Sequence, residues 1–368
     1  MSAPARAAHR VGIAGAGIGA RYARSFQRVP GVEVAALCAT SLERTAPAAR
    51  ELGIARVFTS YEAMLAESAL DVVVIATPND LHHAQALAAI ESGAHVLCDK
   101  PLALDAGQAQ ELLDAAVRRG SRHAIPFWLR FVPALARARE LLADGSFGPP
   151  FFADVRFLNC GWGDPLGPMR WQFERARAGS GAFANIGSHA IDALHWLAGD
   201  LARISAATAI AVPERRRPDG ESARPDAEDT AVFIGQLAGG APVSFLASSV
   251  AYTTRSSIVI AVHCRSGSVT VQIDSGETDP RGRLTVMRRG EDAPHDEALA
   301  APRAAYAGPA DAAYDAIAQE LIDAIDEGRD ASPGFADGVR VQATIDAALA
   351  SAASGRWTDI VTGNGKGR

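Results

Sequence analysis

The chain has 368 residues, a length that exceeds the usual size of one domain and favours two. Its composition, 48% hydrophobic and 21% charged residues, is that of a globular protein with a buried core. The formal net charge of −6 at pH 7 argues against a nucleic-acid-binding protein, which needs cations on the phosphates. No apolar run approaches the ~18 residues of a membrane-spanning helix, so we expect neither nucleic acid nor membrane as a partner.

The N-terminal part alternates short apolar runs with alanine-rich stretches. Strands are predicted over residues 10–14, 32–38, 57–58, 71–76 and 95–98, and helices over 18–28, 42–52, 61–66, 81–91 and 106–118. The run Val72-Val73-Val74-Ile75 is apolar without interruption, which is typical of a central parallel strand. The alternation predicts an α/β fold, with a doubly wound parallel sheet over residues 1–125.

Beyond residue 126 the pattern changes. Helices are predicted over residues 132–142, 186–198, 312–327 and 337–353, and strands over 151–157, 203–211, 230–237, 243–250, 257–264 and 268–273. Consecutive strands without helices between them favour an antiparallel sheet. We therefore expect a second domain over 126–360 and a flexible tail over 361–368. The polar run 213–225, which contains Arg215-Arg216-Arg217, is interpreted as a solvated loop.

The four cysteines, Cys38, Cys98, Cys160 and Cys264, show no C-x-x-C pair and no spacing typical of metal ligands. This pattern is typical of reduced thiols. Residues 1–10 lack the apolar core of a secretion signal. We therefore expect a cytoplasmic protein without a bound metal.

A glycine turn follows the first predicted strand and reads G-x-G-x-x-A at Gly15, Gly17 and Ala20. Gly15 permits a tight turn, Gly17 lets the backbone approach a pyrophosphate, and a small residue at position 20 lets the helix pack on its strand. The phosphates would lie at the helix N-terminus, beside Ile18. Because this turn joins a strand to a helix, it predicts a dinucleotide-binding site.

The choice of nucleotide depends on the end of the second strand. An NAD site usually has an acidic residue there, which binds the ribose 2′-hydroxyl. This chain instead has Thr40, Ser41 and Arg44, which could receive a 2′-phosphate. The cofactor is therefore predicted as NAD(P), with a preference for NADP, although Arg44 could equally be an ordinary exposed helix residue.

Lysine is nearly absent from the chain, which has two lysines, Lys100 and Lys366, and 34 arginines. Lys366 lies in the glycine-rich C-terminal tail, so Lys100 is the lysine of the folded body. Arginine keeps its proton in proteins, whereas lysine can release one. The retention of Lys100 therefore points to a chemical role, although chance retention is an alternative.

Three further segments accompany the glycine turn: residues 76–82 (ATPNDLH), 98–101 (CDKP) and 179–192 (GSGAFANIGSHAID). Together they resemble the glucose–fructose oxidoreductase/inositol dehydrogenase/MocA (Gfo/Idh/MocA) family over nearly the whole chain. The resemblance implies an N-terminal Rossmann domain and a C-terminal α/β domain with an open, mostly antiparallel sheet. It also implies a sugar or polyol dehydrogenase that forms homodimers or homotetramers through that sheet.

The resemblance also implies roles for single residues. Thr77, Pro78 and Asn79 would line the cofactor, with His82 nearby; a residue that satisfies its own helix start is an equal alternative for His82. The family's E-K-P motif is Asp99-Lys100-Pro101 here, with Asp99 at the cofactor and Lys100 hydrogen-bonded to the reacting oxygen. Trp171 is a candidate wall beside the nicotinamide.

The third segment departs from the family pattern Asp-x-x-x-His, because Asn185 takes the place of the aspartate while His189 is retained. His189 is the natural general acid/base, since histidine titrates near neutral pH. Asn185 can orient a hydroxyl but cannot accept a proton. The predicted function is hydride transfer at Lys100 and His189. The alternatives are a cofactor-binding regulatory protein without turnover and a redox-assisted glycosidase.

Overall fold

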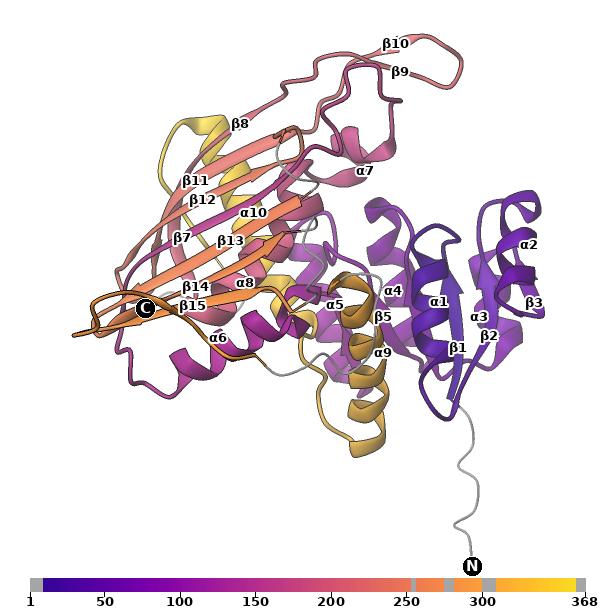
Figure 1. Ribbon diagram of the computed structural model, residues 1–368. Coiled ribbons are helices and arrows are strands. Elements are labelled where there is room, and N and C mark those ends of the chain that lie inside the picture. Colours follow the sequence, from indigo (N-terminus) through magenta and orange to yellow (C-terminus); the bar gives the residue numbers. More distant parts are fainter. Residues whose placement is uncertain (1–8, 253–255, 275–280, 300–308, 362–368) are drawn as a thin grey trace, which may run out of the picture. The chain divides into compact units, whose positions relative to one another are not determined.

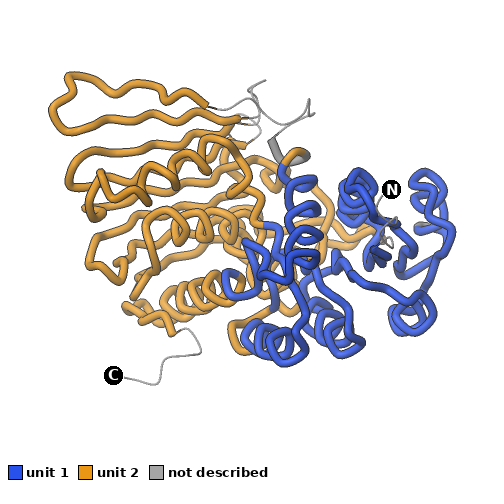
Figure 2. The backbone as a smooth tube through the Cα atoms, turned by 90° about the horizontal axis from the view of Figure 1, so that it is seen from below, with its two compact units in different colours: residues 1–103, 108–126, 313–337 blue, residues 104–107, 127–312, 338–368 orange. Residues whose placement is uncertain are grey.

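A computed structural model describes residues 9–252, 256–274, 281–299 and 309–361 (Figure 1). Contacts divide the chain into two compact units, shown in blue and orange in Figure 2. Unit 1 comprises Met1–Ala103, Gln108–Pro126 and Ala313–Asp337, and unit 2 comprises Leu104–Gly107, Phe127–Ala312 and Gly338–Arg368. The division after Pro126 lies beside the boundary expected at 125, whereas residues 313–337, expected in the second domain, pack with unit 1. The tail predicted over 361–368 lies outside the described residues except for Val361.

Unit 1 contains a six-stranded sheet in which all neighbouring strands are parallel, in the order β3-β2-β1-β4-β5-β6. The strands are β1 (His9–Ala14), β2 (Val32–Cys38), β3 (Arg56–Phe58), β4 (Val72–Ile75), β5 (His95–Cys98) and β6 (His123–Ala124). The helices are α1 (Gly19–Gln27), α2 (Leu42–Glu51), α3 (Tyr61–Ser68), α4 (His82–Glu91), α5 (Ala106–Arg119) and α9 (Pro309–Glu327). The first two residues of α5 and the part of α9 before Ala313 are grouped with unit 2. The predicted doubly wound sheet is confirmed. Its strand order reverses between β1 and β4, which is where such sheets bind ligands.

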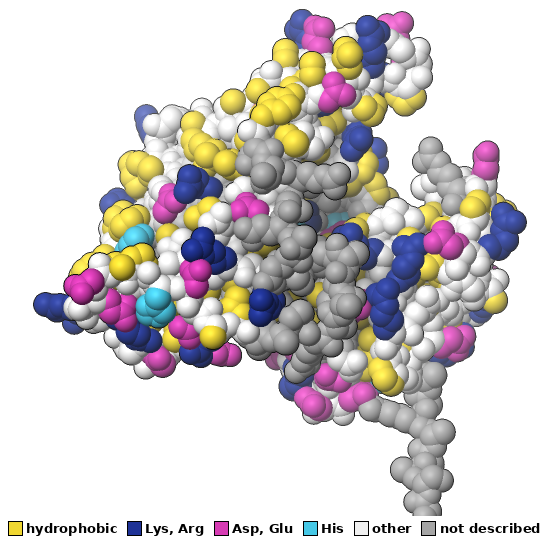
Figure 3. Space-filling view, in the orientation of Figure 1, with side chains coloured by type: hydrophobic (Ala, Val, Ile, Leu, Met, Phe, Trp, Pro, Cys, Tyr) yellow, Lys and Arg dark blue, Asp and Glu magenta, His cyan; other side chains and the backbone are white. Residues whose placement is uncertain are grey.

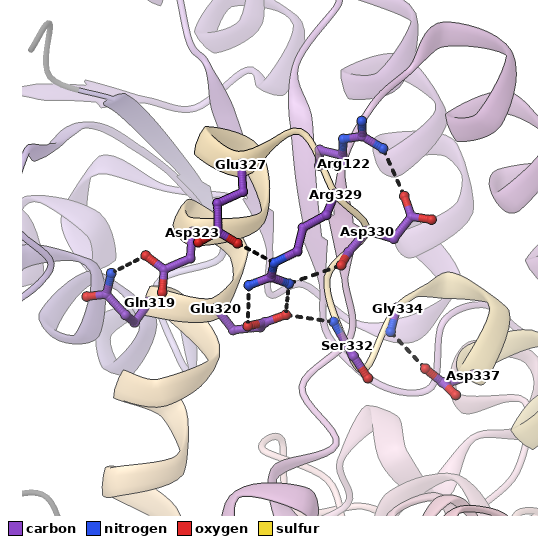
Figure 4. A network of polar contacts seen from close by, with 10 residues as sticks. All are labelled: Arg122, Gln319, Glu320, Asp323, Glu327, Arg329, Asp330, Ser332, Gly334 and Asp337. Carbon is purple, nitrogen blue, oxygen red and sulfur yellow. Dashed lines mark hydrogen bonds and ion pairs between the residues drawn. The ribbon is translucent and has the colours of Figure 1, made fainter.

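The segment that follows α9 is built into unit 1 by polar contacts, drawn in Figure 4. Arg329 donates to both carboxylate oxygens of Glu320, at 2.6 and 3.0 Å, and Arg122 pairs with Asp330 at 2.9 Å. The ring of Phe335 stacks on His123, with 4.5 Å between the centroids. The two contacts to Arg122 and His123 are long-range, and they explain why residues 313–337 group with the N-terminal part, which their position in the sequence does not suggest.

Unit 2 contains a nine-stranded sheet in the order β16-β15-β14-β13-β7-β12-β11-β8-β17. β7 and β12 pair in parallel and the other neighbours are antiparallel, so the predicted mostly antiparallel sheet is confirmed. The strands are β7 (Pro150–Asn159), β8 (Leu201–Ala209), β11 (Thr230–Leu237), β12 (Pro242–Ser248), β13 (Ser256–Cys264), β14 (Gly267–Asp274), β15 (Arg283–Arg288), β16 (His295–Asp296) and β17 (Thr358–Asp359). A separate hairpin pairs β9 (Arg215–Arg216) with β10 (Ser222–Ala223).

Helices cover one face of this sheet. They include α6 (Pro133–Ala143) and α8 (Ser188–Ala198), while α7 (Arg175–Ala178) is short and α10 (Phe335–Ser354) begins in unit 1 and continues through unit 2 (Figure 1). The covered face carries the core aromatics, since Phe233 stacks on Phe245 with 4.4 Å between the centroids. No helix of the part of the chain that the structure describes is long and apolar enough to cross a membrane.

A buried ion pair fixes α8 inside unit 2. Arg130, from the short helix Trp128–Phe131, donates to both carboxylate oxygens of Asp192, at 2.8 and 2.5 Å. Both side chains are almost fully buried. Removal of one partner of such a pair typically costs about 3–5 kcal/mol, because a buried charge is left behind. Asp192 is therefore a structural residue of the segment that carries His189.

Candidate active site

The glycine turn of unit 1 lies at the reversal point of the sheet. Gly15 follows β1 with a φ of +104°, in the region that favours glycine, and a Cβ there would lie 2.1 Å from the carbonyl oxygen of Ala76, just past β4. Its backbone N–H donates to the carbonyl of Cys38, at the end of β2 (2.8 Å). Gly15 therefore brings the ends of three strands together, and no other residue fits this position.

The other glycines of the turn serve different purposes. A Cβ at Gly17 would meet no atom within 4 Å, which leaves open space for a ligand to approach the backbone. A Cβ at Gly19 would lie 2.9 Å from a methyl group of Ile13. Gly19 is buried, so α1 packs closely on β1 at this position. Ala20 is partly exposed, and the packing role predicted for it stays a prediction.

The N-terminus of α1 has the properties of an anion site. Ile18 is the N-cap residue and 36% exposed, no side chain caps the helix, and its first turn contains no acidic residue. Free backbone N–H groups at a helix start attract phosphates. The end of β2 continues as Ala39, Thr40 and Ser41 with no acid, and Thr40 is exposed. The side chain of Arg44 lies outside the described residues.

His82 joins two of the loops that the motifs define. Its ring nitrogens face two carbonyl oxygens, that of Pro101 at 2.8 Å and that of Thr77 at 2.9 Å. The fully buried side chain of His82 thus joins two loops of unit 1, and the cofactor contact expected of it stays a prediction. Thr77 in turn donates to Gln85 at 2.7 Å, and Asn79 is buried at the start of a short helix.

Asp99 is turned into unit 1 by a group that the sequence did not reveal. Its Oδ1 accepts hydrogen bonds from the hydroxyl of Tyr22 (3.2 Å) and from the backbone N–H of Lys100 (2.8 Å). Burial, together with the Asp99 charge, raises the pKa of Tyr22, whose ring meets Tyr314 edge-on at 5.1 Å. Asp99 thus anchors the turn that presents Lys100. The role expected of Asp99 as a cofactor ligand stays a prediction.

Lys100 is the cation of this turn. Burial lowers the pKa of its ammonium group, and the neighbouring Asp99 carboxylate opposes this shift. A lysine whose proton is held less tightly is suited to exchange protons or hydrogen bonds with a substrate oxygen. Lysine can therefore release or share a proton at this turn, which arginine cannot do.

The segment with Asn185 and His189 lies in unit 2. Residues Phe183–Gly187 form a π-helical turn that runs directly into α8, so the helix predicted over 186–198 begins three residues earlier. π-turns are rare and occur frequently at functional sites. Asn185 is partly exposed within an otherwise buried run, and His189 lies edge-on to Phe127 and Trp128, with ring centroids 6.1 and 5.9 Å apart.

The loop around residues 160–170 is held by an arginine that was interpreted as solvated. Arg215 is only 3% exposed; it donates to the carbonyl oxygen of Trp162 at 2.6 Å and lies over the ring of Phe173 at 4.0 Å. The solvated-loop interpretation is therefore wrong for Arg215. Trp171 lies in the short helix Trp171–Phe173, beside this arrangement and partly exposed.

Two family models match the chain. One, described as an oxidoreductase family with an NAD-binding Rossmann fold, matches residues 9–127, and the other, its C-terminal alpha/beta domain, matches residues 139–360. A levoglucosan dehydrogenase from Pseudarthrobacter phenanthrenivorans is 30% identical over 341 residues, which covers 86% of this chain and 87% of that protein. A D-glucoside 3-dehydrogenase from Escherichia coli is 32% identical over 52% of this chain and 54% of that protein.

Solved structures resemble the chain over nearly its full length. A levoglucosan dehydrogenase in complex with NADH and L-sorbose has a TM-score of 0.89 at 27% identity, covering 96% of this chain and 99% of that one. An oxidoreductase domain protein from Kribbella flavida has a TM-score of 0.88 at 28% identity, covering 97% and 100%.

Alanine substitutions should separate the two roles of the glycine turn. We expect Gly15→Ala to destabilise the protein by about 1–3 kcal/mol, because the new Cβ overlaps the Ala76 carbonyl and φ is positive. Gly17→Ala should leave the melting temperature within a few degrees but weaken NADH binding at least tenfold. Thermal unfolding and NADH fluorescence titration measure both. Equal melting temperatures for the two variants would contradict the assignment.

Proposed function

Because the chain belongs to the Gfo/Idh/MocA oxidoreductase family, we propose that it transfers a hydride between NAD(P) and a sugar, a polyol or a related hydroxy or keto compound. The protein is an oxidoreductase that acts on CH–OH groups. The observation that carries the proposal is the glycine turn at the sheet reversal, where Gly17 leaves open space beside an uncapped helix start. Relatives named as levoglucosan and D-glucoside dehydrogenases support the carbohydrate class.

In this proposal the N-terminal motifs hold the cofactor. Gly15 shapes the turn, Gly17 and Ile18 present backbone N–H groups to the pyrophosphate, and Thr77, Pro78 and Asn79 line the path beyond it. Bound NAD(P) supplies the hydride acceptor or donor. Trp171 is assigned to the wall of the nicotinamide site, and Asp99 supports the turn from within the domain.

Two side chains, His189 and Lys100, are assigned to the reacting hydroxyl group of the substrate. His189 takes the proton of the substrate hydroxyl during oxidation and returns it during reduction. Lys100 donates a hydrogen bond to the same oxygen and stabilises the charge that develops there. Asn185, which cannot titrate, orients the substrate hydroxyl. The pKa of Lys100 is lowered by burial, and this supports a lysine that shares its proton.

The nucleotide preference is proposed as NADP. The end of β2 continues with Thr40 and Ser41, so no carboxylate takes the place where an acid would bind a ribose 2′-hydroxyl. The levoglucosan dehydrogenase structure contains NADH, which makes NAD the competing choice.

Fluorescence titration with NADH and NADPH, followed by oxidation assays, tests this function. We expect tighter binding of NADPH and oxidation of at least one cyclic sugar, with levoglucosan as the first probe of a polyol and aldose panel. Tighter binding of NADH would overturn the nucleotide preference alone. Binding without turnover over the whole panel would favour a regulatory protein. Release of p-nitrophenol from aryl glycosides without net cofactor reduction would favour a glycosidase.

Substitutions at Lys100 and His189 test the proton assignment. Lys100→Arg keeps the charge but binds its proton too tightly, so we expect kcat to fall roughly 100-fold or more. His189→Asn removes the acid/base and should have a similar effect. Both variants should bind reduced cofactor within a few-fold of the wild type, as titration would show. Near-normal turnover in Lys100→Arg would refute the role given to this lysine.

The open face of the unit 2 sheet is proposed as the interface of a homodimer or homotetramer. Val232 and Ile234 of β11 are 38% and 57% exposed, on the face opposite the helices. Asp154 and Arg156 of β7 lie in the same rows of the sheet, with β12 between the two strands. Figure 3 shows apolar and charged side chains side by side over these strands. Exposed apolar residues grouped on one face are typical of interfaces.

A charged substitution tests this interface. Ile234→Asp should shift the mass measured by light scattering toward the monomer, because the carboxylate would be buried without a partner. Val117→Asp, at an apolar residue that is 70% exposed on α5, is the matched control and should leave the mass unchanged. An unchanged mass for both variants would place the interface elsewhere.

The predicted cytoplasmic location is supported by the cysteines. All four are free thiols. Burial raises the pKa of Cys38 and of Cys264 to about 11, which keeps both protonated and unreactive. Unpaired thiols of this kind suit a reducing compartment.

A further inference from the structure

The segment that carries Asn185 and His189 is held at its start by a carboxylate outside all the motifs, that of Glu228. Glu228 lies two residues before β11, and its side chain is only 2% exposed. One oxygen, Oε1, accepts three hydrogen bonds: from the hydroxyl of Ser180 (2.6 Å), the N–H of Gly181 (2.9 Å) and the N–H of Phe183 (3.2 Å). All of these residues belong to unit 2.

The backbones of the two segments also touch. The N–H of Ala182 donates to the carbonyl of Glu228 at 2.7 Å. A Cβ at Gly181 would lie 1.9 Å from that carbonyl oxygen, so the position requires glycine. Gly181 through Phe183 therefore lie directly against Glu228, through its main chain and its side chain together.

The residues around the π-turn contain no side-chain acceptor for the N–H groups at its start, and Glu228 supplies one. The π-turn Phe183–Gly187 has no side-chain cap, and its first turn contains no acidic residue. The first N–H groups of a helix have no partner within it and favour a negative charge. Hydrogen bonds to a carboxylate are about twice as strong as those between neutral groups. A residue 43 positions after Asn185 thus completes the helix start.

We propose that Glu228 is a positioning residue, whose carboxylate fixes the π-turn and thereby the placement of Asn185 and His189 during hydride transfer. This proposal rests on the catalytic role proposed for His189. A displacement of about 1 Å in a reacting group can cost roughly 100-fold in rate. The second oxygen, Oε2, lies 3.8 Å from Nη2 of Arg175, which orients the carboxylate with Oε1 toward the helix start.

Three substitutions separate the position of the carboxyl group from its charge. Glu228→Gln keeps the length and one carbonyl oxygen for the same three donors. Glu228→Asp keeps the charge but withdraws the oxygens by about 1.5 Å, one C–C bond. Glu228→Ala removes the acceptor. We expect kcat for levoglucosan oxidation to fall at least 30-fold in Glu228→Ala and Glu228→Asp, and to stay within fivefold of wild type in Glu228→Gln.

Two readouts distinguish positioning from a loss of folding. NADH affinity, which depends on unit 1, should stay within threefold in all three variants. Amide hydrogen exchange, measured by mass spectrometry on peptides over residues 180–190, should rise at least tenfold in Glu228→Ala and return toward wild type in Glu228→Gln. Asp229→Asn is the matched control, because Asp229 is equally buried but accepts from the N–H groups of Ala211 and Val212. It should leave exchange at 180–190 unchanged.

The outcomes separate this proposal from the function on which it rests. If Glu228→Ala keeps kcat within threefold while His189→Asn loses activity, the positioning role is overturned and the function stands. If wild-type protein oxidises no sugar, the proposed function fails, and exchange at 180–190 still decides whether Glu228 holds the turn. Unchanged exchange in Glu228→Ala overturns the proposal in either case.

Discussion

Unit 1 depends on one close approach of two backbones. Gly15, after β1, and Ala76, after β4, lie so close that a single added carbon would overlap a carbonyl oxygen. This contact joins the ends of β1 and β4 at the point where the strand order reverses, and it directs the chain into α1. Everything proposed for the cofactor follows from it, because the uncapped start of α1 and the loop from Ala76 to Asn79 are positioned by the same pair of strand ends.

A second constraint recurs through both units. The motif residues are held by buried polar groups that do not themselves belong to the proposed chemistry. Asp99 is fixed by Tyr22, and two loops are joined by His82, both within unit 1. Within unit 2, Arg130 fixes Asp192. Buried polar groups of this kind define one arrangement, because any displacement leaves a donor or acceptor without a partner.

The sequence predicted those parts of the protein that depend on local pattern. The continuous apolar run at Val72–Ile75 identified a central strand, and the spacing of Gly15 and Gly17 identified the turn. The close packing at Gly19 was not predicted, because the fingerprint counts positions and does not measure the distance to Ile13. The two-residue edge strands, such as β16 and β17, are too short to show a periodicity.

Long-range contacts were beyond prediction from one sequence. Nothing local distinguishes buried Arg215 from its exposed neighbours Arg216 and Arg217, since its burial depends on Trp162 and Phe173. Glu228 likewise acts on a segment that lies far away along the chain. In both cases the partner is brought close by the fold of unit 2, and the residue type alone carries no signal of it.

The contribution of residues 313–337 to unit 1 has a consequence for synthesis on the ribosome. Tyr314 of α9 packs against Tyr22 of α1, and Arg21 lies over the ring of Tyr314. A nascent chain that has passed residue 126 holds all six strands of the parallel sheet but lacks this cover. It must then wait while more than half of the protein is translated, since such contacts form only after the intervening chain has been made. Unit 1 is thus the first unit whose sheet strands are all synthesised, but it is completed only after most of unit 2 has been made.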